Sequence, residues 1–144
     1  MKKSIIIVLS CCFLFSNCSD NQDPIEPQKI EYLWHLVKVT GGIAAIDEEF
    51  SRGTITWSFD DATKKLVVEN NNDNITIEDA LDSGSYDYDV LELEQELYLI
   101  IDENEFGNFK ISQNLLVIDQ NKMSTGDGSD GFIYSFQAET IVVE

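Results

Sequence analysis

The sequence has 144 residues and carries 9 Lys and Arg against 27 Asp and Glu, a formal net charge of −18. This length corresponds to one domain, and the acidic balance argues against a nucleic-acid-binding protein, because phosphate recognition needs a basic face. Hydrophobic residues make up 43% of the chain, which is typical of a folded domain and exceeds what a disordered acidic tail contains.

Residues 1–17 are predicted to be a lipoprotein signal peptide. Lys2 and Lys3 precede an apolar run, Ile5–Phe15, that only Ser10 interrupts. The run is too short to span about 30 Å of hydrocarbon and matches the apolar region of a secretory signal. The following Phe15-Ser16-Asn17-Cys18 resembles the lipobox of bacterial lipoproteins. The resemblance implies cleavage before Cys18 and attachment of lipid to its thiol.

The lipobox departs from the common pattern, which has Leu where Phe15 stands and a small residue where Asn17 stands. Looser boxes are familiar in the Bacteroidota, a group that the composition of the chain resembles. Cys11 and Cys12 are competing lipidation sites, but either choice shortens the apolar run. A cleaved signal without lipid and a retained anchor are further alternatives. With all three cysteines in this region, the predicted mature domain has no disulfide and no cysteine nucleophile.

Residues 18–29 are predicted to be the lipidated cysteine and a flexible tether. The segment is polar, lacks periodicity and contains both prolines, Pro24 and Pro27, so an extended linker is expected. Asp20 and Asp23 resemble the surface-export signal of Bacteroidota lipoproteins. That resemblance implies an outer-membrane lipoprotein displayed at the cell surface; an ordinary solvated linker is the alternative.

Residues 30–144 are predicted to form one all-β domain. Apolar and polar residues alternate with period two, which indicates strands with one buried face. Strands are expected at 32–40, 54–59, 65–69, 86–90, 97–101, 108–112, 115–119, 132–138 and 140–143. Short turns join most of them, so we expect an antiparallel up-and-down meander of about eight strands. Closure into a small barrel would remove the two exposed edges of such a sheet.

Two stretches break the alternation. Ile43, Ile46 and Phe50 lie at helical spacing, which indicates a helical cover of one or two turns over a barrel mouth. Residues 70–83 are rich in Asn and Asp and have few apolar anchors, so either an extra strand or a mobile loop is expected there.

The order of these features resembles the lipocalin-like lipoproteins of the Bacteroidota. Four segments carry the resemblance: Trp34–Gly42, Gly53–Phe59, Ser83–Tyr88 and Asp130–Phe136. It implies a lipocalin-like barrel of about eight strands whose first strand carries an inward Trp34. The chain departs from true lipocalins because Tyr32 stands where a glycine would be, and a helix after the last strand is absent from the pattern. A lipocalin's hydrophobic ligand does not follow from this resemblance, because fold alone does not specify function.

Residues suited to catalysis are few, and we expect no enzyme. His35 is the only histidine, and it is interpreted as a strand or surface residue. Glu92, Glu94 and Glu96 would share one face of a regular strand; a solvated exterior is favoured over a pair of carboxylates for glycoside hydrolysis.

No cofactor and no metal site are expected. Asp127, Ser129 and Asp130 in the glycine-rich turn, together with Asp60 and Asp61, leave a weak calcium site as an alternative. Asp and Gly are equally the residues that a tight turn requires.

The aromatic residues are the main candidates for a site. They are either a packed core or the lining of a pocket for one small ligand, and they comprise Trp34, Trp57, Phe59, Tyr86, Tyr88, Phe132, Tyr134 and Phe136. The first hypothesis is a surface-anchored binding or accessory module that holds a small hydrophobic or sugar-like ligand or an envelope partner. The alternative is a structural or protein-interaction lipoprotein with a filled barrel. A void lined by Tyr86, Tyr88 and Tyr134 would favour binding.

Overall fold

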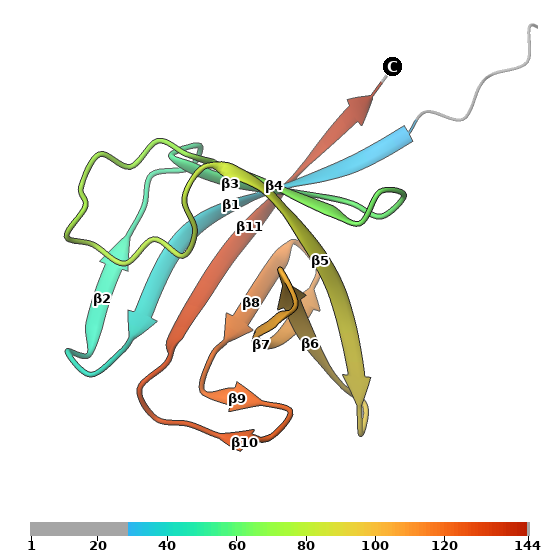
Figure 1. Cartoon of the computed structure of the whole chain (residues 1–144). Coiled ribbons are helices and arrows are strands. Elements are labelled where there is room, and N and C mark those ends of the chain that lie inside the picture. Colours follow the sequence, from blue (N-terminus) through green and yellow to red (C-terminus); the bar gives the residue numbers. More distant parts are fainter. Residues whose placement is uncertain (1–28, 144) are drawn as a thin grey trace, which may run out of the picture.

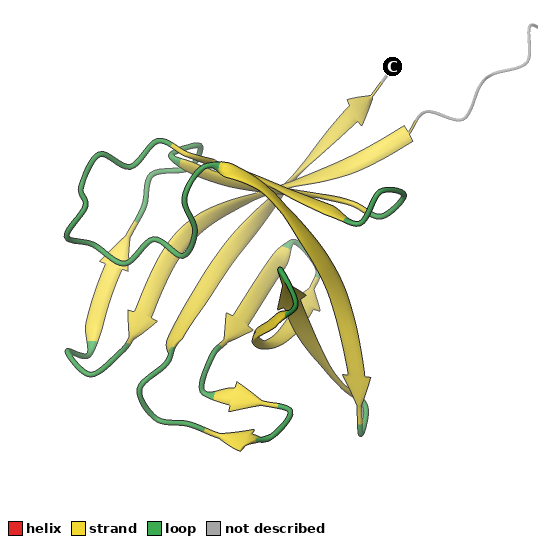
Figure 2. Cartoon of the chain, viewed as in Figure 1, coloured by secondary structure: helices red, strands yellow, loops and turns green. Residues whose placement is uncertain are grey.

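The computed structural model describes residues 29–143. The predicted signal peptide, Cys18 and the tether up to Gln28 lie outside the described residues. The described part is built of strands and loops and contains no helix (Figure 2). It therefore holds no helix long and apolar enough to cross a membrane.

Eight strands form a closed antiparallel barrel (Figure 1). Around the barrel they are β1 (Lys29–Gly41), β3 (Ile55–Asp60), β4 (Lys65–Asn70), β5 (Gly84–Leu93), β6 (Glu96–Ile101), β7 (Asn104–Ser112), β8 (Leu115–Asp119) and β11 (Phe132–Val143). Pairing of β11 with β1 closes the ring. The expected antiparallel barrel of about eight strands is therefore confirmed.

Strand β2 (Ile46–Glu49) is a ninth strand of the same sheet and replaces the expected helical cover. The register of β1 against β11 shifts between Leu36 and Lys38. The first half of β1 pairs with β3, whereas Lys38–Gly41 pairs with β2. The helix prediction was wrong because the backbone groups at the free edge of β1 form hydrogen bonds with this segment. These bonds stabilise a strand more than a short stretch of helical spacing stabilises a helix.

The last strand is longer than predicted, and the Asn-rich segment forms no strand. Residues 132–138 and 140–143 belong to the single strand β11, which pairs with β1 from Lys29 to Gly41. Residues 71–83 form an irregular loop in which Asn and Asp side chains supply many of the hydrogen bonds. A small hairpin, β9 (Lys122–Met123) and β10 (Gly126–Asp127), lies between β8 and β11.

The two ends of the barrel differ. At one end, called here the open end, β1 begins and β11 finishes beside the turns at 61–64, 94–95 and 113–114. At the other, called the closed end, lie the β1–β2 turn, the loop 71–83 and the β9–β10 hairpin (Figure 1). Alternation of strand direction thus places the first described residues, starting at Lys29, at the open end.

Candidate functional site

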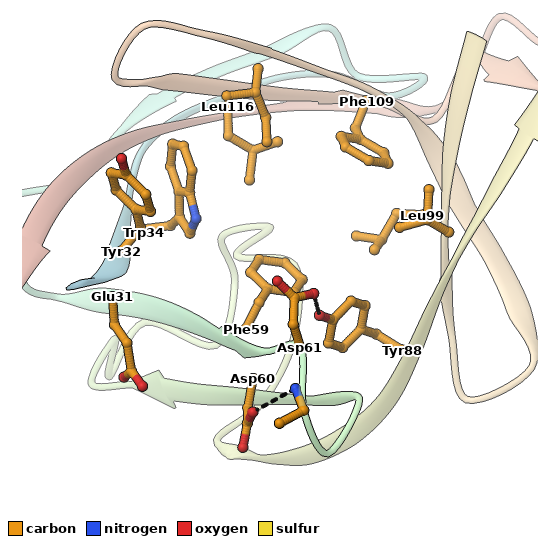
Figure 3. Close-up of a pocket in the computed structure, with 13 residues that line it drawn as sticks. Glu31, Tyr32, Trp34, Phe59, Asp60, Asp61, Tyr88, Leu99, Phe109 and Leu116 are labelled. Carbon is orange, nitrogen blue, oxygen red and sulfur yellow. Dashed lines mark hydrogen bonds between the residues drawn. The ribbon is translucent and has the colours of Figure 1, made fainter. Parts of the chain in front are cut away.

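A cavity of about 540 Å³ opens at the open end of the barrel (Figure 3). Six of the eight barrel strands and the β3–β4 turn contribute to it. The lining residues are Glu31, Tyr32, Trp34, Phe59, Asp60, Asp61, Ala62, Tyr88, Val90, Leu99, Phe109, Ile111 and Leu116. Its size is within the range of roughly 300–1,000 Å³ common for small-molecule sites.

The walls of the cavity follow from strand alternation. In β5, Tyr88 and Val90 face inward on the same side of the strand, and Leu99 of β6 pairs with Val90. In β7 and β8, Phe109 and Leu116 face the cavity from neighbouring strands. Side chains at alternate positions of a strand share one face, so each inward position near the open end adds a hydrocarbon group to the wall.

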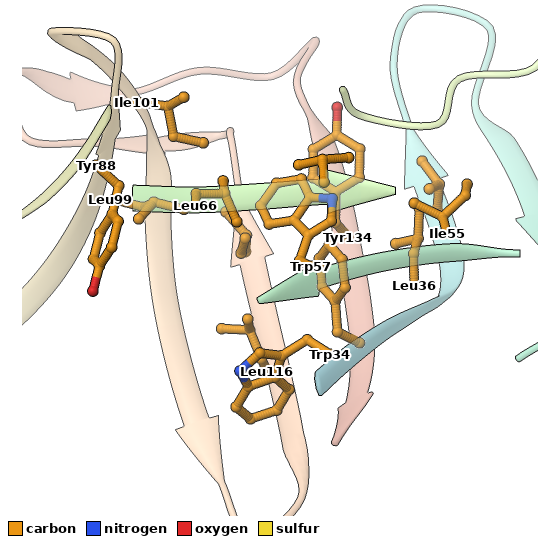
Figure 4. Close-up of a cluster of buried hydrophobic side chains, with 14 residues drawn as sticks. Trp34, Leu36, Ile55, Trp57, Leu66, Tyr88, Leu99, Ile101, Leu116 and Tyr134 are labelled. Atoms are coloured by element: carbon orange, nitrogen blue, oxygen red, sulfur yellow. The ribbon is translucent and has the colours of Figure 1, made fainter. Parts of the chain in front are cut away.

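The floor of the cavity is the packed core (Figure 4). Trp57 is fully buried and lies 4.8 Å from Phe136 and 5.8 Å from Phe106 between ring centroids. Phe106 stacks on Tyr134 at 5.5 Å. The Trp57 indole nitrogen is buried with no hydrogen-bond partner among the described residues. The barrel is thus filled at mid-height, below the open-end cavity.

The rim of the cavity is acidic. Asp60 caps the β3–β4 turn: its carboxylate accepts hydrogen bonds from the backbone nitrogen of Ala62 and from the hydroxyl and backbone nitrogen of Thr63. The Tyr88 hydroxyl donates to Oδ1 of Asp61 at 2.6 Å. With Glu31 on the β1 side, three carboxylates and no basic side chain stand among the described residues that line the cavity.

Tyr88 is held in its neutral form. Burial raises its pKa above the ordinary value of 10.0, and the hydrogen bond to Asp61 and the charges of Asp61, Asp60 and Asp89 raise it further. The Lys64 ammonium lies 5.4 Å from the centroid of the Tyr88 ring and 3.7 Å from Oδ1 of Asp61. The Tyr88 ring and the rim carboxylate therefore already attract one cation of the chain itself.

The closed end is covered by the loop 71–83. The Tyr134 hydroxyl donates to Oε1 of Glu78 at 2.9 Å, and the same oxygen accepts from the backbone nitrogen of Ala80 at 3.1 Å. Leu81 packs against the core. A second, more open hollow of about 320 Å³ lies between this loop and the β1–β2 turn, beside Phe132.

The structure divides the eight predicted aromatic residues between these regions. Three of them line the cavity: Trp34, Phe59 and Tyr88. Three are buried in the core: Trp57, Tyr134 and Phe136. Phe132 borders the second hollow, and Tyr86 is half-buried with its hydroxyl donating to the Asp82 carbonyl oxygen. Of the three tyrosines expected around a void, only Tyr88 lines the cavity.

His35 lies on the opposite face of β1 from Trp34, outside the cavity. It is buried, and its Nε2 lies 2.9 Å from Oε2 of Glu139, which Arg52 also contacts at 3.4 Å. The structure therefore places His35 beside the Arg52–Glu139 ion pair, on the outer face of the barrel wall.

The row of Glu92, Glu94 and Glu96 does not exist, because the chain reverses there. Glu94 and Gln95 form a two-residue hairpin turn with φ of 52° and 70°. Glu92 lies on β5 and Glu96 on β6. The sequence did not predict this turn, because Glu-Gln contains none of the Gly, Asn or Asp residues that usually adopt positive φ in two-residue hairpins.

The residues of the alternative calcium site are not brought together. Asp127 and Asp130 lie by the closed end, whereas Asp60 and Asp61 lie at the open end. Across residues 29–143, no group of three or more His, Cys, Asp or Glu side chains is arranged to hold a metal ion.

Most of the cavity wall was missing from the sequence prediction. Leu99, Phe109, Ile111 and Leu116 were recognised only as strand residues, and Glu31 was not singled out. Leu99 lies between Tyr98 and Ile100, and Leu116 lies between Leu115 and Val117, so alternation alone does not identify the inward face there. The height of each residue along the barrel depends on strand register.

Comparison of the chain with models of known protein families, with curated proteins and with solved structures found no match.

Proposed function

We propose that this chain is a surface-anchored lipoprotein of the outer membrane whose barrel holds one small ligand in the open-end cavity, without catalysis. One observation supports binding over a filled barrel: the apolar cavity of about 540 Å³ above a packed core. An all-β closed barrel is compatible with the lipocalin-like fold that the sequence resembles, and the lipocalin-like lipoproteins of the Bacteroidota are the proposed family.

The proposed anchor fits the position of the cavity. Glu31 and Tyr32, in the first residues of β1, line the mouth. From Cys18 to Lys29 the chain is eleven steps long, so a lipid at Cys18 would hold the mouth within about 40 Å of the membrane surface at full extension. A ligand with an apolar body could then exchange between membrane and cavity over a short path.

The experiment is uptake of the neutral dye Nile red by the full chain, followed by its fluorescence. We expect saturable binding of one dye per chain. Ala62→Trp, at the mouth, should abolish uptake by filling the cavity. Ala44→Trp, in an exposed turn at the closed end, is the matched control and should leave uptake unchanged. Absence of saturable uptake, or equal uptake by both variants, would overturn the binding function.

Native mass spectrometry of the mature chain isolated from its own envelope then addresses the natural ligand. Bound mass that disappears on denaturation, and is missing from the Ala62→Trp variant, is the expected result. Bound mass that remains in Ala62→Trp would place the ligand outside the cavity and contradict the proposal.

The second candidate function is a structural module that contacts an envelope protein. The β5–β6 hairpin favours it, because β4 pairs with β5 only as far as Asp87 and residues 89–93 pair with β6 alone. Leu91, Leu93 and Leu97 are exposed on this hairpin, and an exposed strand edge is a template for another chain. If Nile red fails to bind, Leu91→Lys should abolish co-purification of an envelope protein with the chain.

A further inference from the structure

The charges and walls of the open-end cavity indicate which class of small molecule it would accept. We infer that the cavity selects an apolar molecule that carries a positively charged amine or ammonium group, with the cation at the Asp61 rim and the apolar body against the hydrocarbon walls. This inference rests on the proposed binding function and specifies its ligand.

The walls set the nature of the ligand body. The cavity walls are hydrocarbon and ring atoms, from buried Leu99 and Leu116, half-buried Phe109, and the more exposed Val90 and Ile111. These side chains offer no hydrogen bonds to hydroxyl groups, and burying an unpaired hydroxyl costs free energy. A sugar would leave most of its hydroxyls unpaired there, whereas an alkyl or aromatic group would be stabilised by burial.

The rim sets the charge of the ligand head. The Asp61 side chain is 91% exposed, and its contacts with Tyr88 and Lys64 both use Oδ1. Figure 3 shows its carboxylate beside the Tyr88 hydroxyl, to which it is hydrogen-bonded. Asp60 and Glu31 add two more negative charges to the lining. A ligand carboxylate or phosphate at the mouth would face repulsion from the exposed Asp61 carboxylate, whereas a cation would be attracted to it.

The aromatic rings near the rim reinforce this preference. Tyr88 and Phe59 lie 5.0 Å apart in an edge-to-face arrangement, and Trp34, on β1 next to the strand of Phe59, also lines the cavity (Figure 3). The electron-rich faces of such rings attract ammonium groups. Lys64 already lies over the Tyr88 ring, which shows that a cation is accommodated at this position. A ligand cation would compete with Lys64 for the same ring and carboxylate.

The experiment compares two amphiphiles of equal chain length, decyltrimethylammonium and decanoate, below the concentrations at which they form micelles. Isothermal titration calorimetry of the full chain should show at least a tenfold tighter dissociation constant for the cation. Asp61→Asn should weaken cation binding several-fold. Lys64→Gln should strengthen it several-fold, because it removes the competing ammonium group.

The control variant is Glu103→Gln, which removes one carboxylate charge, as Asp61→Asn does. Glu103 lies in an exposed turn at the closed end, away from the cavity. The variant should leave both affinities unchanged. If it weakens cation binding as much as Asp61→Asn does, the preference reflects the overall negative charge of the chain, and the inference is overturned.

The two experiments distinguish failure of the cationic-ligand inference from failure of the proposed binding function. Nile red uptake together with equal or tighter binding of decanoate would leave the binding function standing and overturn the cationic ligand. Absence of Nile red uptake together with absence of binding by either amphiphile would overturn both.

Discussion

The hydroxyl of Tyr88 donates a 2.6 Å hydrogen bond to Oδ1 of Asp61, and this bond ties the wall of the barrel to the β3–β4 turn. Tyr88 belongs to β5, and the turn joins β3 to β4, the strand that pairs with β5. The bond therefore fixes one side of the cavity mouth and keeps a carboxylate beside an aromatic ring.

Tyr88 should make stability fall at alkaline pH. Its pKa is raised in the folded state above the ordinary value of 10.0, so the folded state disfavours the phenolate. The stabilisation is fully present below pH 10 and is lost as the pH rises further. Urea unfolding of the unaltered chain should lose more free energy between about pH 9 and about pH 11 than unfolding of Tyr88→Phe. Identical pH profiles for the two chains would contradict this interpretation.

Trp57→Ala should destabilise the barrel by about 3–5 kcal/mol, because it removes a fully buried indole and leaves a cavity in the core. Trp34→Ala should cost clearly less, because Trp34 already borders an open space. Chemical denaturation of both variants measures the difference. Equal losses would show that Trp34 is as tightly packed as Trp57, and an unchanged midpoint for Trp57→Ala would contradict the barrel core described above.

Gly107→Ala should destabilise the protein by about 1–3 kcal/mol. Gly107 has a φ of 150°, and an added Cβ would lie 2.8 Å from the Asp119 carbonyl oxygen on the neighbouring strand. Gly53→Ala is the matched control: its φ of 90° is also positive, but no atom lies within 4 Å of the added Cβ. Thermal melting should therefore show a larger loss for Gly107→Ala, and the reverse order would be evidence against close approach of β7 and β8.

Tyr134→Phe should loosen the cover of the closed end. It removes the hydrogen bond to Glu78 while keeping the ring in the core. Hydrogen exchange should become faster for the loop 71–83 and remain unchanged for the turn at 113–114, because the two lie at opposite ends of the barrel. Faster exchange at both places would mean that the variant destabilises the whole barrel and not the loop alone.

Glu96 should contribute to loss of stability in acid. Hydrogen bonds from Asn108 and Lys110 lower its pKa below the ordinary value of 4.5, so the folded state favours the carboxylate. This stabilisation is present above the unfolded pKa and is lost as the pH falls through the folded one. Glu96→Gln should therefore lose less stability between about pH 6 and about pH 3 than the unaltered chain. Glu103→Gln, at an exposed turn of the closed end, serves as the control and should match the unaltered chain.

The sequence predicted most strands well because many of them carry their own period-two pattern. Trp57 and Phe59 in β3, or Phe136 and Tyr134 in β11, alternate with polar neighbours, and a half-buried strand needs no further information. The sequence-based prediction failed where a local pattern competed with a tertiary contact. Ile43, Ile46 and Phe50 have helical spacing, but residues of this segment pair with the edge of β1 and form strand β2.

The sequence by itself determined an acidic, single-domain, antiparallel barrel with an aromatic interior, because composition and alternation are local properties. Only the tertiary structure decided where the interior is filled and where it is hollow. Trp57, on the floor, and Phe59, on the wall, are two residues apart on the same face of β3. Their different surroundings depend on strand register and on the turns at each end, which bring Asp61 to Tyr88 at the mouth and Glu78 to Tyr134 at the closed end.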